Sequence, residues 1–175
     1  AQTNCDDLRR LLMLEPRGHA DMYGAVLTPP ATPDGDLGVL FLHNAGWSTM
    51  CGHGIIGLVK GGLDAGLFPR PEGRDEIRID TPAGRVVAAP RYGSDGQVEQ
   101  VSFLNVPSFV VQPSPSLRVP GLGPVRGELA FGGAFYYYVD AAEAGLELEP
   151  SRYSDIVRRG RELKAANSVL IKVNQ

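Results

Sequence analysis

HNAGWSTMCGHGIIG occupies residues 43–57 and connects an apolar run at residues 37–42 to a second apolar run at residues 55–63. The first run is strand-like, and the second has the length of a helix. Between them lies a loop in which Cys51 and His53 stand two residues apart among glycines. The pattern predicts a strand, a loop with reactive side chains and the start of a helix.

A helix start carries backbone N–H groups that have no partner in the helix, together with a partial positive charge. Such a position binds carboxylate or phosphate groups and stabilises the thiolate form of a nearby cysteine. We therefore interpret Cys51 as an acid/base or nucleophilic thiol. The N–H groups of Gly52, His53 and Gly54 are candidates for holding an anionic group of the substrate.

The chain has 175 residues and a formal net charge of −3 at pH 7, which fits one domain or two small ones. This mild, balanced charge gives no indication of a nucleic-acid or membrane-surface partner. No apolar run approaches the ~20 residues of a membrane span, and the start does not resemble a signal peptide. Cys5 and Cys51 stand in very different surroundings, so a disulfide is not expected and a cytosolic, reduced protein is the default.

The order of the expected elements indicates an α+β fold rather than alternating β–α–β units. Helices are expected at residues 4–14, with Asn4 as the cap, at 54–65 and at 151–166. Strands are expected at residues 22–27, 37–42, 76–81, 85–90 and 98–106, in two parts of 125–140 that a glycine break separates, and at 169–173.

Each expected helix has a predicted buried face. In the first, Leu8, Leu11 and Leu12 form one apolar side. The second is apolar around most of its circumference, so we expect it to be enclosed, with glycines that permit close packing of other backbone at positions 57, 61 and 62. In the third, the expected inward residues are Tyr153, Ile156, Val157, Gly160 and Leu163, and the expected outward residues are Arg152, Arg158, Arg159, Arg161 and Glu162.

With Met50-Cys51-Gly52-His53-Gly54 identified, the chain resembles the proline racemase family, which includes proline racemases, 4-hydroxyproline 2-epimerases and trans-3-hydroxyproline dehydratases. Met-Cys-Gly-His at the head of an apolar helix is highly specific for that family. Further blocks in the family order are EPRGH at 15–19 with MYG at 22–24, IDTPAG at 79–84, SFLNVPSF at 102–109 and FGGAFY at 131–136.

This resemblance implies a diaminopimelate-epimerase-like fold, in which mixed or antiparallel strands wrap around a central apolar helix. Family members have two such lobes, with one catalytic residue at the start of the central helix of each. Cys51 matches the first of these residues. The second lies in an Asp-x-Ser-Pro-(Cys or Thr)-Gly segment, which this sequence does not contain. We therefore expect residues 1–175 to be a single lobe, the N-terminal lobe of a two-lobed enzyme whose second lobe is absent from this chain.

The resemblance also implies catalysis without a metal or an organic cofactor, on proline or hydroxyproline as the small-molecule substrate. His53 is expected to help hold the substrate nitrogen, and the nearby backbone its carboxylate. Trp47-Ser48-Thr49 resembles the dehydratase branch, in which a thiolate removes the α-proton of trans-3-hydroxy-L-proline and a pyrroline-2-carboxylate forms. The alternative is a proline racemase or 4-hydroxyproline 2-epimerase that uses two cysteines.

Other interpretations of these residues stay open. Cys51 can be a small thiol that fills a tight glycine loop, and His53 can cap the helix or bond a carbonyl. A zinc site would need more ligands than Cys51, His53 and His43, and a Cys–His hydrolase would need a third group that the sequence does not identify. A further alternative is an inactive half-enzyme that associates with itself, for example as a homodimer, or with another partner through an exposed interface.

Overall fold

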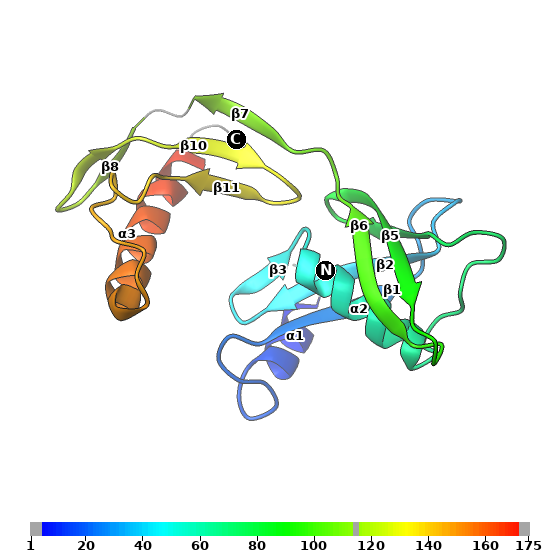
Figure 1. Ribbon diagram of the computed structural model, residues 1–175. Coiled ribbons are helices and arrows are strands. Elements are labelled where there is room, and N and C mark those ends of the chain that lie inside the picture. The colour runs from blue at the N-terminus through cyan, green and yellow to red at the C-terminus, as the bar shows by residue number, and fades with distance from the viewer. Residues whose placement is uncertain (1–4, 114–115, 172–175) are drawn as a thin grey trace. The chain divides into compact units, whose positions relative to one another are not determined.

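The computed structural model describes residues 5–113 and 116–171, and Figure 1 shows the helices and strands. The chain divides into two compact units, Ala1–Pro107 and Ser108–Gln175. Each unit has its own sheet and its own buried residues. The expectation that residues 1–175 form one lobe of a two-lobed enzyme concerns the complete protein and stays a prediction.

The first unit is built on a six-stranded sheet in the order β1-β2-β4-β5-β6, with β3 added beside β2. β2 and β4 are parallel, and α2 lies between them in the chain, whereas the other pairs are antiparallel. This arrangement confirms the α+β prediction, although β3 lies in a stretch that was predicted as a loop. The strands are β1 (Tyr23–Thr28), β2 (Leu37–His43), β3 (Gly46–Ser48), β4 (Ile77–Thr81), β5 (Gly84–Tyr92) and β6 (Val98–Leu104).

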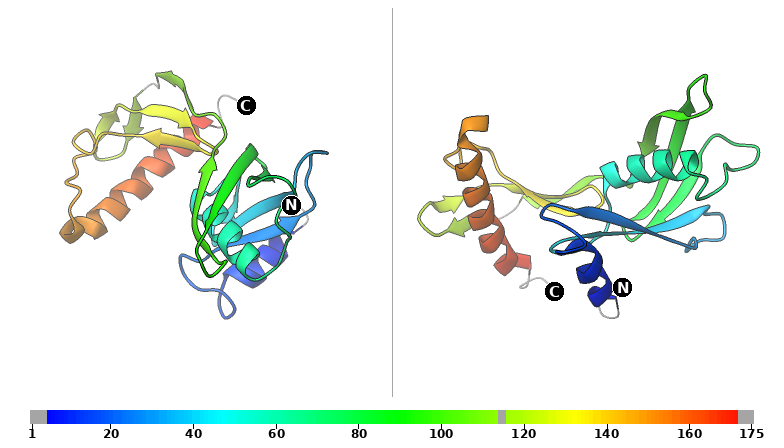
Figure 2. Two further views of the ribbon diagram at one scale, coloured as in Figure 1. Left: turned by 45° about the vertical axis from the view of Figure 1, so that its right-hand side comes forward. Right: turned by 90° about the horizontal axis from the view of Figure 1, so that it is seen from below.

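Helix α2 (Gly52–Asp64) lies in the curl of this sheet. Both edge strands, β1 and β6, contact the helix, as does β5, and Figure 2 shows the strands curving past it. Ile55, Val59 and Gly62 are its buried residues, and their spacing makes one stripe along the helix. The predicted wrapping of strands around a central apolar helix is therefore confirmed.

The prediction that α2 is enclosed all round is wrong for this chain, because only the stripe that faces the sheet is buried. Ile56, Gly57 and Gly61 lie on the exposed side. A Cβ atom on Gly57 or Gly61 would meet no atom within 4 Å, so neither glycine is required by packing among the described residues. Gly62 differs, because a Cβ there would lie 2.2 Å from a ring carbon of Phe68.

Strand β2 forms the centre of the core and is buried on both faces. Phe41 lies under the start of α2, while the side chains of Leu42 and Met13 both lie close to Gly24 of β1. Neighbouring strands add the remaining apolar residues of this core, which include Leu37, Val39, Ile77, Ile79, Val86, Ala88, Val98 and Val106. The burial of β2 on two sides explains why its sequence is continuously apolar rather than alternating.

Helix α1 (Asp6–Met13) turns a different face inward from the one that was predicted. Leu8, Leu11 and Leu12 are 49%, 48% and 38% exposed, whereas Arg9 is 6% exposed. Burial of Arg9 is possible because its guanidinium donates to the Asp6 carboxylate and to two backbone carbonyls. The predicted cap residue, Asn4, lies outside the described residues, and Cys5 takes the N-cap position without a side-chain hydrogen bond.

The second unit combines a three-stranded sheet, a two-stranded hairpin and a helix. The sheet has the order β11-β10-β7, and β10 and β11 are the two strands predicted on either side of the glycine break. The two-stranded hairpin was not predicted. It contributes Leu117, Val119 and Val125 to a small core, against which Tyr137 and Leu163 pack. The elements are β7 (Phe109–Pro113), β8 (Leu117–Val119), β9 (Gly123–Val125), β10 (Glu128–Phe131), β11 (Phe135–Tyr138), the 3-10 turn Pro150–Arg152 and α3 (Tyr153–Ile171).

Helix α3 packs against β8, as Figure 2 also shows, and its buried face differs in part from the predicted one. Tyr153 and Gly160 are exposed, whereas Arg159 is half-buried because its guanidinium pairs with Glu162. The strand predicted at residues 169–173 is wrong, because the helix continues to Ile171, and residues 172–175 lie outside the described residues. In the part of the chain that the structure describes, no helix has the length and hydropathy needed to cross a membrane.

The adjacent glycines of α2 provide a matched test of this packing. We expect Gly61→Ala to raise the free energy of unfolding by about 0.5–1 kcal/mol, because alanine is the better helix former and the site is open. Gly62→Ala should lower it by about 1–3 kcal/mol, because the new methyl group collides with Phe68. Urea denaturation of the two variants measures both values, and a shift of the same sign in both would contradict the described packing.

Candidate active site

Cys51 is the N-cap residue of α2, at the position that the sequence predicted as the helix start. Its backbone is extended, with φ −145° and ψ 113°, and its Sγ accepts a hydrogen bond from the Gly54 N–H at 3.3 Å. The side chain is half-buried and the thiol is free. The sulfur therefore takes the place that a serine or aspartate oxygen takes in most helix caps, and it keeps partial access to solvent.

The backbone around the sulfur is arranged to stabilise negative charge. Ile55 N–H donates to the Cys51 carbonyl at 2.9 Å, which closes the first helical turn. Gly52 and His53 stand at the first positions of the helix, where N–H groups have no carbonyl four residues back within the helix. The positive end of the helix dipole adds to this field, so an anion placed beside Cys51 is stabilised.

Two aromatic rings lie directly against the glycines of the helix start. A Cβ on Gly54 would lie 2.5 Å from Phe41, and a Cβ on Gly52 would lie 3.1 Å from Phe103. Any other residue at position 54 would displace a ring that is fully buried in the core. The glycines therefore have a packing role, which is compatible with the predicted role of their N–H groups in holding a substrate.

The structure bears on the plainer interpretations of the two predicted side chains. Cys51 is not a buried filler, because it is half-exposed, and the helix cap is the Cys51 sulfur rather than His53. His53 is exposed in the first turn of α2. Among the described residues, no group of three or more His, Cys, Asp and Glu side chains is placed to hold a metal ion.

The loop before Cys51 is held by contacts that sequence reasoning missed. The turn between β2 and β3 accepts two hydrogen bonds from Arg9 of α1, at the His43 carbonyl (2.9 Å) and the Asn44 carbonyl (2.6 Å). Asn44 Nδ2 in turn donates to the carbonyls of Met13 and His19. The buried arginine could not be found from the helical pattern, because its partners are thirty-four and more residues away in the sequence.

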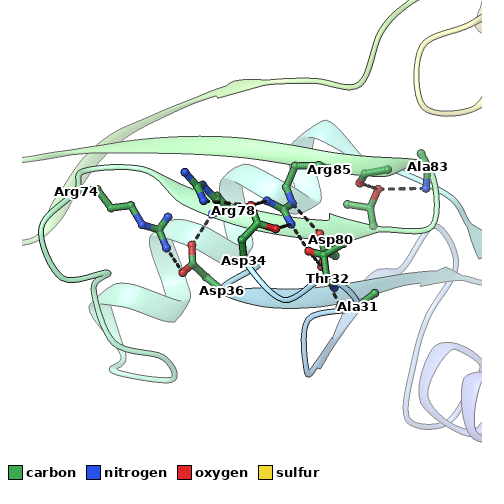
Figure 3. A network of polar contacts seen from close by, with 11 residues as sticks. Ala31, Thr32, Asp34, Asp36, Arg74, Arg78, Asp80, Ala83 and Arg85 are labelled. Carbon is green, nitrogen blue, oxygen red and sulfur yellow. Dashed lines mark hydrogen bonds and ion pairs between the residues drawn. The ribbon is translucent and has the colours of Figure 1, made fainter.

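A buried carboxylate lies at the end of β4, and Figure 3 shows its surroundings. Asp80 is 8% exposed, and its Oδ2 accepts from the N–H groups of Ala31 (2.9 Å) and Thr32 (2.8 Å) and from the Thr32 hydroxyl (2.8 Å). Its Oδ1 accepts from Arg85 Nε at 2.7 Å. Burial alone would raise the pKa of Asp80, but the hydrogen bonds from Arg85 and Thr32 outweigh burial and lower it.

The polar network continues along the same strands (Figure 3). Arg85 Nη2 also contacts Asp34 at 3.0 Å. Asp36 Oδ2 accepts from the Arg78 N–H at 2.6 Å, and its other oxygen pairs with Arg74. Here too burial raises the pKa of the Asp36 carboxyl, and the bonds from Arg74 and Arg78 outweigh it, so that the pKa is lowered. These ionised carboxylates tie the loop between β1 and β2 to β4 and to Arg85 of β5.

The turn from β4 to β5 touches the loop that carries Cys51. The Thr81 hydroxyl accepts from the Ala83 N–H at 3.2 Å and donates to the Gly84 carbonyl at 2.9 Å. The Ala83 N–H also donates to the Thr49 carbonyl, again at 3.2 Å. Thr49 precedes Cys51 by two residues, so the network around Asp80 and the candidate catalytic loop meet at this turn.

Comparisons of this sequence and structure with known proteins all indicate the same family. The protein-family model described as proline racemase matches residues 1–175. Trans-3-hydroxy-L-proline dehydratase of Azospirillum brasilense is 44% identical over 164 residues, which are 93% of this chain and 48% of that protein. A 3-hydroxyproline 2-epimerase of Burkholderia multivorans has the same identity and coverage.

Solved structures agree with the sequence relatives. A probable proline racemase from Agrobacterium radiobacter K84, with bound carbonate, superposes with a TM-score of 0.76 and 31% identity over 84% of this chain and 43% of that one. A hydroxyproline epimerase from Agrobacterium vitis, with bound trans-4-hydroxy-L-proline, superposes with a TM-score of 0.75 and 30% identity, over the same shares of the two chains. The chain thus spans about half the length of the relatives it matches.

The carboxylate network predicts an acid-dependent stability. Asp80 and Asp36 have lowered pKa values in the folded state. Their contribution to stability is therefore fully present at pH values above the pKa of an aspartate in the unfolded chain, about 3.9. We expect the free energy of unfolding to decline as the pH falls below about 4, through the folded pKa values. Asp80→Asn should cost about 2–3 kcal/mol at neutral pH and make the acid decline shallower.

Urea denaturation between neutral and acidic pH measures this dependence. Asp95→Asn is the matched control, because Asp95 is exposed and the amide oxygen of asparagine can still accept the hydrogen bond from the Gln97 N–H. If the free energy of unfolding declines with the same slope in acid for Asp80→Asn and for the unmutated chain, Asp80 is not a cause of the acid dependence.

Proposed function

This chain belongs to the proline racemase family, and from that premise we propose that it supplies the first catalytic group of a cofactor-independent dehydratase acting on trans-3-hydroxy-L-proline. The group is the Cys51 thiolate, which removes the α-proton. The supporting observation is the sulfur's place at the start of α2, half-exposed and hydrogen-bonded to the Gly54 N–H. Relatives named as dehydratases support the choice of substrate.

The chemistry requires a base and a stabiliser of developing charge. The α-hydrogen of an amino acid is very weakly acidic, and its removal places negative charge on the carboxylate oxygens. In the proposed reaction the Cys51 thiolate forms the S–H bond, and the electron pair of the C–H bond moves toward the carboxylate. The N–H groups of Gly52 and His53 are the proposed holders of that anion, because the third candidate, the Gly54 N–H, already donates to the Cys51 sulfur. The His53 side chain is proposed to help hold the substrate nitrogen.

The fate of the carbanion separates dehydration from epimerisation. When the substrate carries a 3-hydroxyl, the electron pair forms a C2–C3 double bond and the hydroxyl leaves, which gives a pyrroline-2-carboxylate and, after proton uptake, water. When a second thiol faces the opposite side of the α-carbon, it delivers a proton there and the product is the epimer. The relative named 3-hydroxyproline 2-epimerase and the solved hydroxyproline epimerase support this alternative.

A non-catalytic alternative is favoured by one feature of the second unit. Five apolar side chains of β7 and β11 are each more than half exposed, namely those of Phe109, Val110, Phe135, Tyr136 and Tyr138. Exposed apolar surface of this kind is typical of an interface. In this alternative the chain is an inactive half-enzyme that associates with itself, and sedimentation velocity showing a monomer at all concentrations would contradict it.

Hydrogen exchange tests the catalytic proposal directly. The complete two-lobed protein is incubated in D₂O with trans-3-hydroxy-L-proline, with 4-hydroxyproline and with each enantiomer of proline, and proton NMR follows the α-hydrogen and the product. We expect the dehydration product from the first substrate. Cys51→Ser should lower kcat by about 10²–10⁴-fold, the usual contribution of a catalytic base.

Cys5→Ser is the matched control, because Cys5 is the other cysteine of the chain and its exposed thiol has no role in the proposed reaction. It should leave kcat unchanged. Epimer without dehydration would favour the alternative enzyme, and an unaltered rate in Cys51→Ser would end the proposal for Cys51.

A further inference from the structure

We propose that Thr81 is a positioning residue for Cys51, acting through the turn between β4 and β5. This inference rests on the proposed function, because it assigns Thr81 a task only if the Cys51 sulfur must be held in place. Thr81 does not touch the sulfur. Its hydroxyl braces the turn whose Ala83 N–H donates to the Thr49 carbonyl, two residues before Cys51.

The turn itself is well defined. Thr81 pairs with Gly84 at the end of the hairpin, so Pro82 and Ala83 form its tip. The Thr81 hydroxyl accepts from the Ala83 N–H within this tip and donates to the Gly84 carbonyl beyond it. Gly84 has a φ of +128°, where L side chains are rarely found, and a Cβ there would lie 3.2 Å from Val106. The direction of the Ala83 N–H is therefore set by the hydroxyl and by close packing together.

The base of the hairpin is fixed by the Asp80 network. Asp80 precedes Thr81, and its carboxylate is bonded by Thr32 from one side and by Arg85 from the next strand (Figure 3). Moving the turn away from its position would separate a buried charge from these donors, which is costly. The hairpin is thus a rigid support that ends at the Ala83 N–H.

The receiving loop is short and is bonded to that support. The Thr49 carbonyl accepts from Ala83, and the Met50 carbonyl accepts from the Ser48 hydroxyl at 3.0 Å. Two residues of chain span at most about 7 Å, so a shift of Thr49 passes to Cys51 with little attenuation. The contact between Cys51 Sγ and the Gly54 N–H, at 3.3 Å, is the one such a shift would disturb.

The opposite end of α2 is held independently of the turn. Lys60 Nζ donates to the Val98 carbonyl at 2.5 Å, and Asp64 Oδ1 accepts from the Val98 N–H at 2.8 Å. These bonds tie the helix to β6. Loss of the Thr81 contact is therefore expected to act on the loop that carries Cys51 rather than on the place of the helix as a whole.

Alkylation of the thiol tests the proposal without any need for turnover. In a Cys5→Ser background Cys51 is the only thiol of the 175-residue chain, and its second-order rate with iodoacetamide reports how well the sulfur is positioned. We expect Thr81→Val, which keeps the shape and removes the hydroxyl, to slow this rate about fivefold, the equilibrium ratio that corresponds to one net hydrogen bond. Thr81→Ser should restore the unmutated rate.

The controls separate positioning from general loss of stability. Asp36→Asn weakens the same network at its far end, beside Arg74, so it should lower stability but leave the alkylation rate unchanged. An unchanged rate in a folded Thr81→Val, or an equal slowing in Asp36→Asn, overturns the positioning role and leaves the proposed function intact. If Cys51 of the unmutated chain reacts no faster than free cysteine, the proposed function fails and this inference with it.

A second measurement covers the case in which Thr81→Val does not fold, as circular dichroism would show. Amide hydrogen exchange in the unmutated chain then reports the Ala83 N–H directly. Slow exchange, comparable with that of the Ile55 N–H in the first turn of α2, is expected from its hydrogen bond to Thr49. Exchange as fast as that of an exposed loop amide would overturn the proposal.

Discussion

The candidate site depends on the hydrogen bond that the Cys51 sulfur accepts from the Gly54 N–H, and strands of the first unit support the helix start at which this bond forms. The N–H groups of a helix start require acceptors. A sulfur is a large and weak acceptor, and it fills this place at Cys51, whose extended backbone is the usual conformation of an N-cap residue. The entry is set by β2, which is buried on both faces and can hardly shift.

Glycine makes this arrangement possible, and the reason is close approach rather than flexibility. Phe41 lies against Gly54 and Phe103 against Gly52, so the helix start rests on two rings supplied by β2 and β6. These strands are far apart in the sheet order, and the curl of the sheet brings both to the same helix end. The two rings hold the helix start in place, and the N–H groups of its first turn stabilise negative charge on the Cys51 sulfur.

The sequence predicted the elements whose partners are local or strongly patterned. The α+β class, the central apolar helix and the position of Cys51 at its start all depend on periodicity and on the Met50–Gly54 block. The prediction failed for α1, where the burial of Arg9 depends on carbonyls of the β2–β3 turn more than thirty residues away. For the same reason no prediction was made for Asp80, whose contacts are with Thr32 and with Arg85 of the neighbouring strand. Contacts of this range leave no periodic signal in the chain.

The choice of a carboxylate at position 80 needs a further explanation. An apolar side chain of similar volume would fill the same space, and replacing a buried ion pair in that way is often neutral or stabilising. Such an apolar side chain would not orient the neighbouring backbone. The Asp80 carboxylate does so because it accepts four hydrogen bonds, which come from Ala31, Thr32 and Arg85. The residue after Asp80 braces the turn that bonds Thr49. The buried charge is therefore best understood as a constraint on direction, since the proposed role of the Cys51 thiol gains more from a fixed place than from extra stability of the fold.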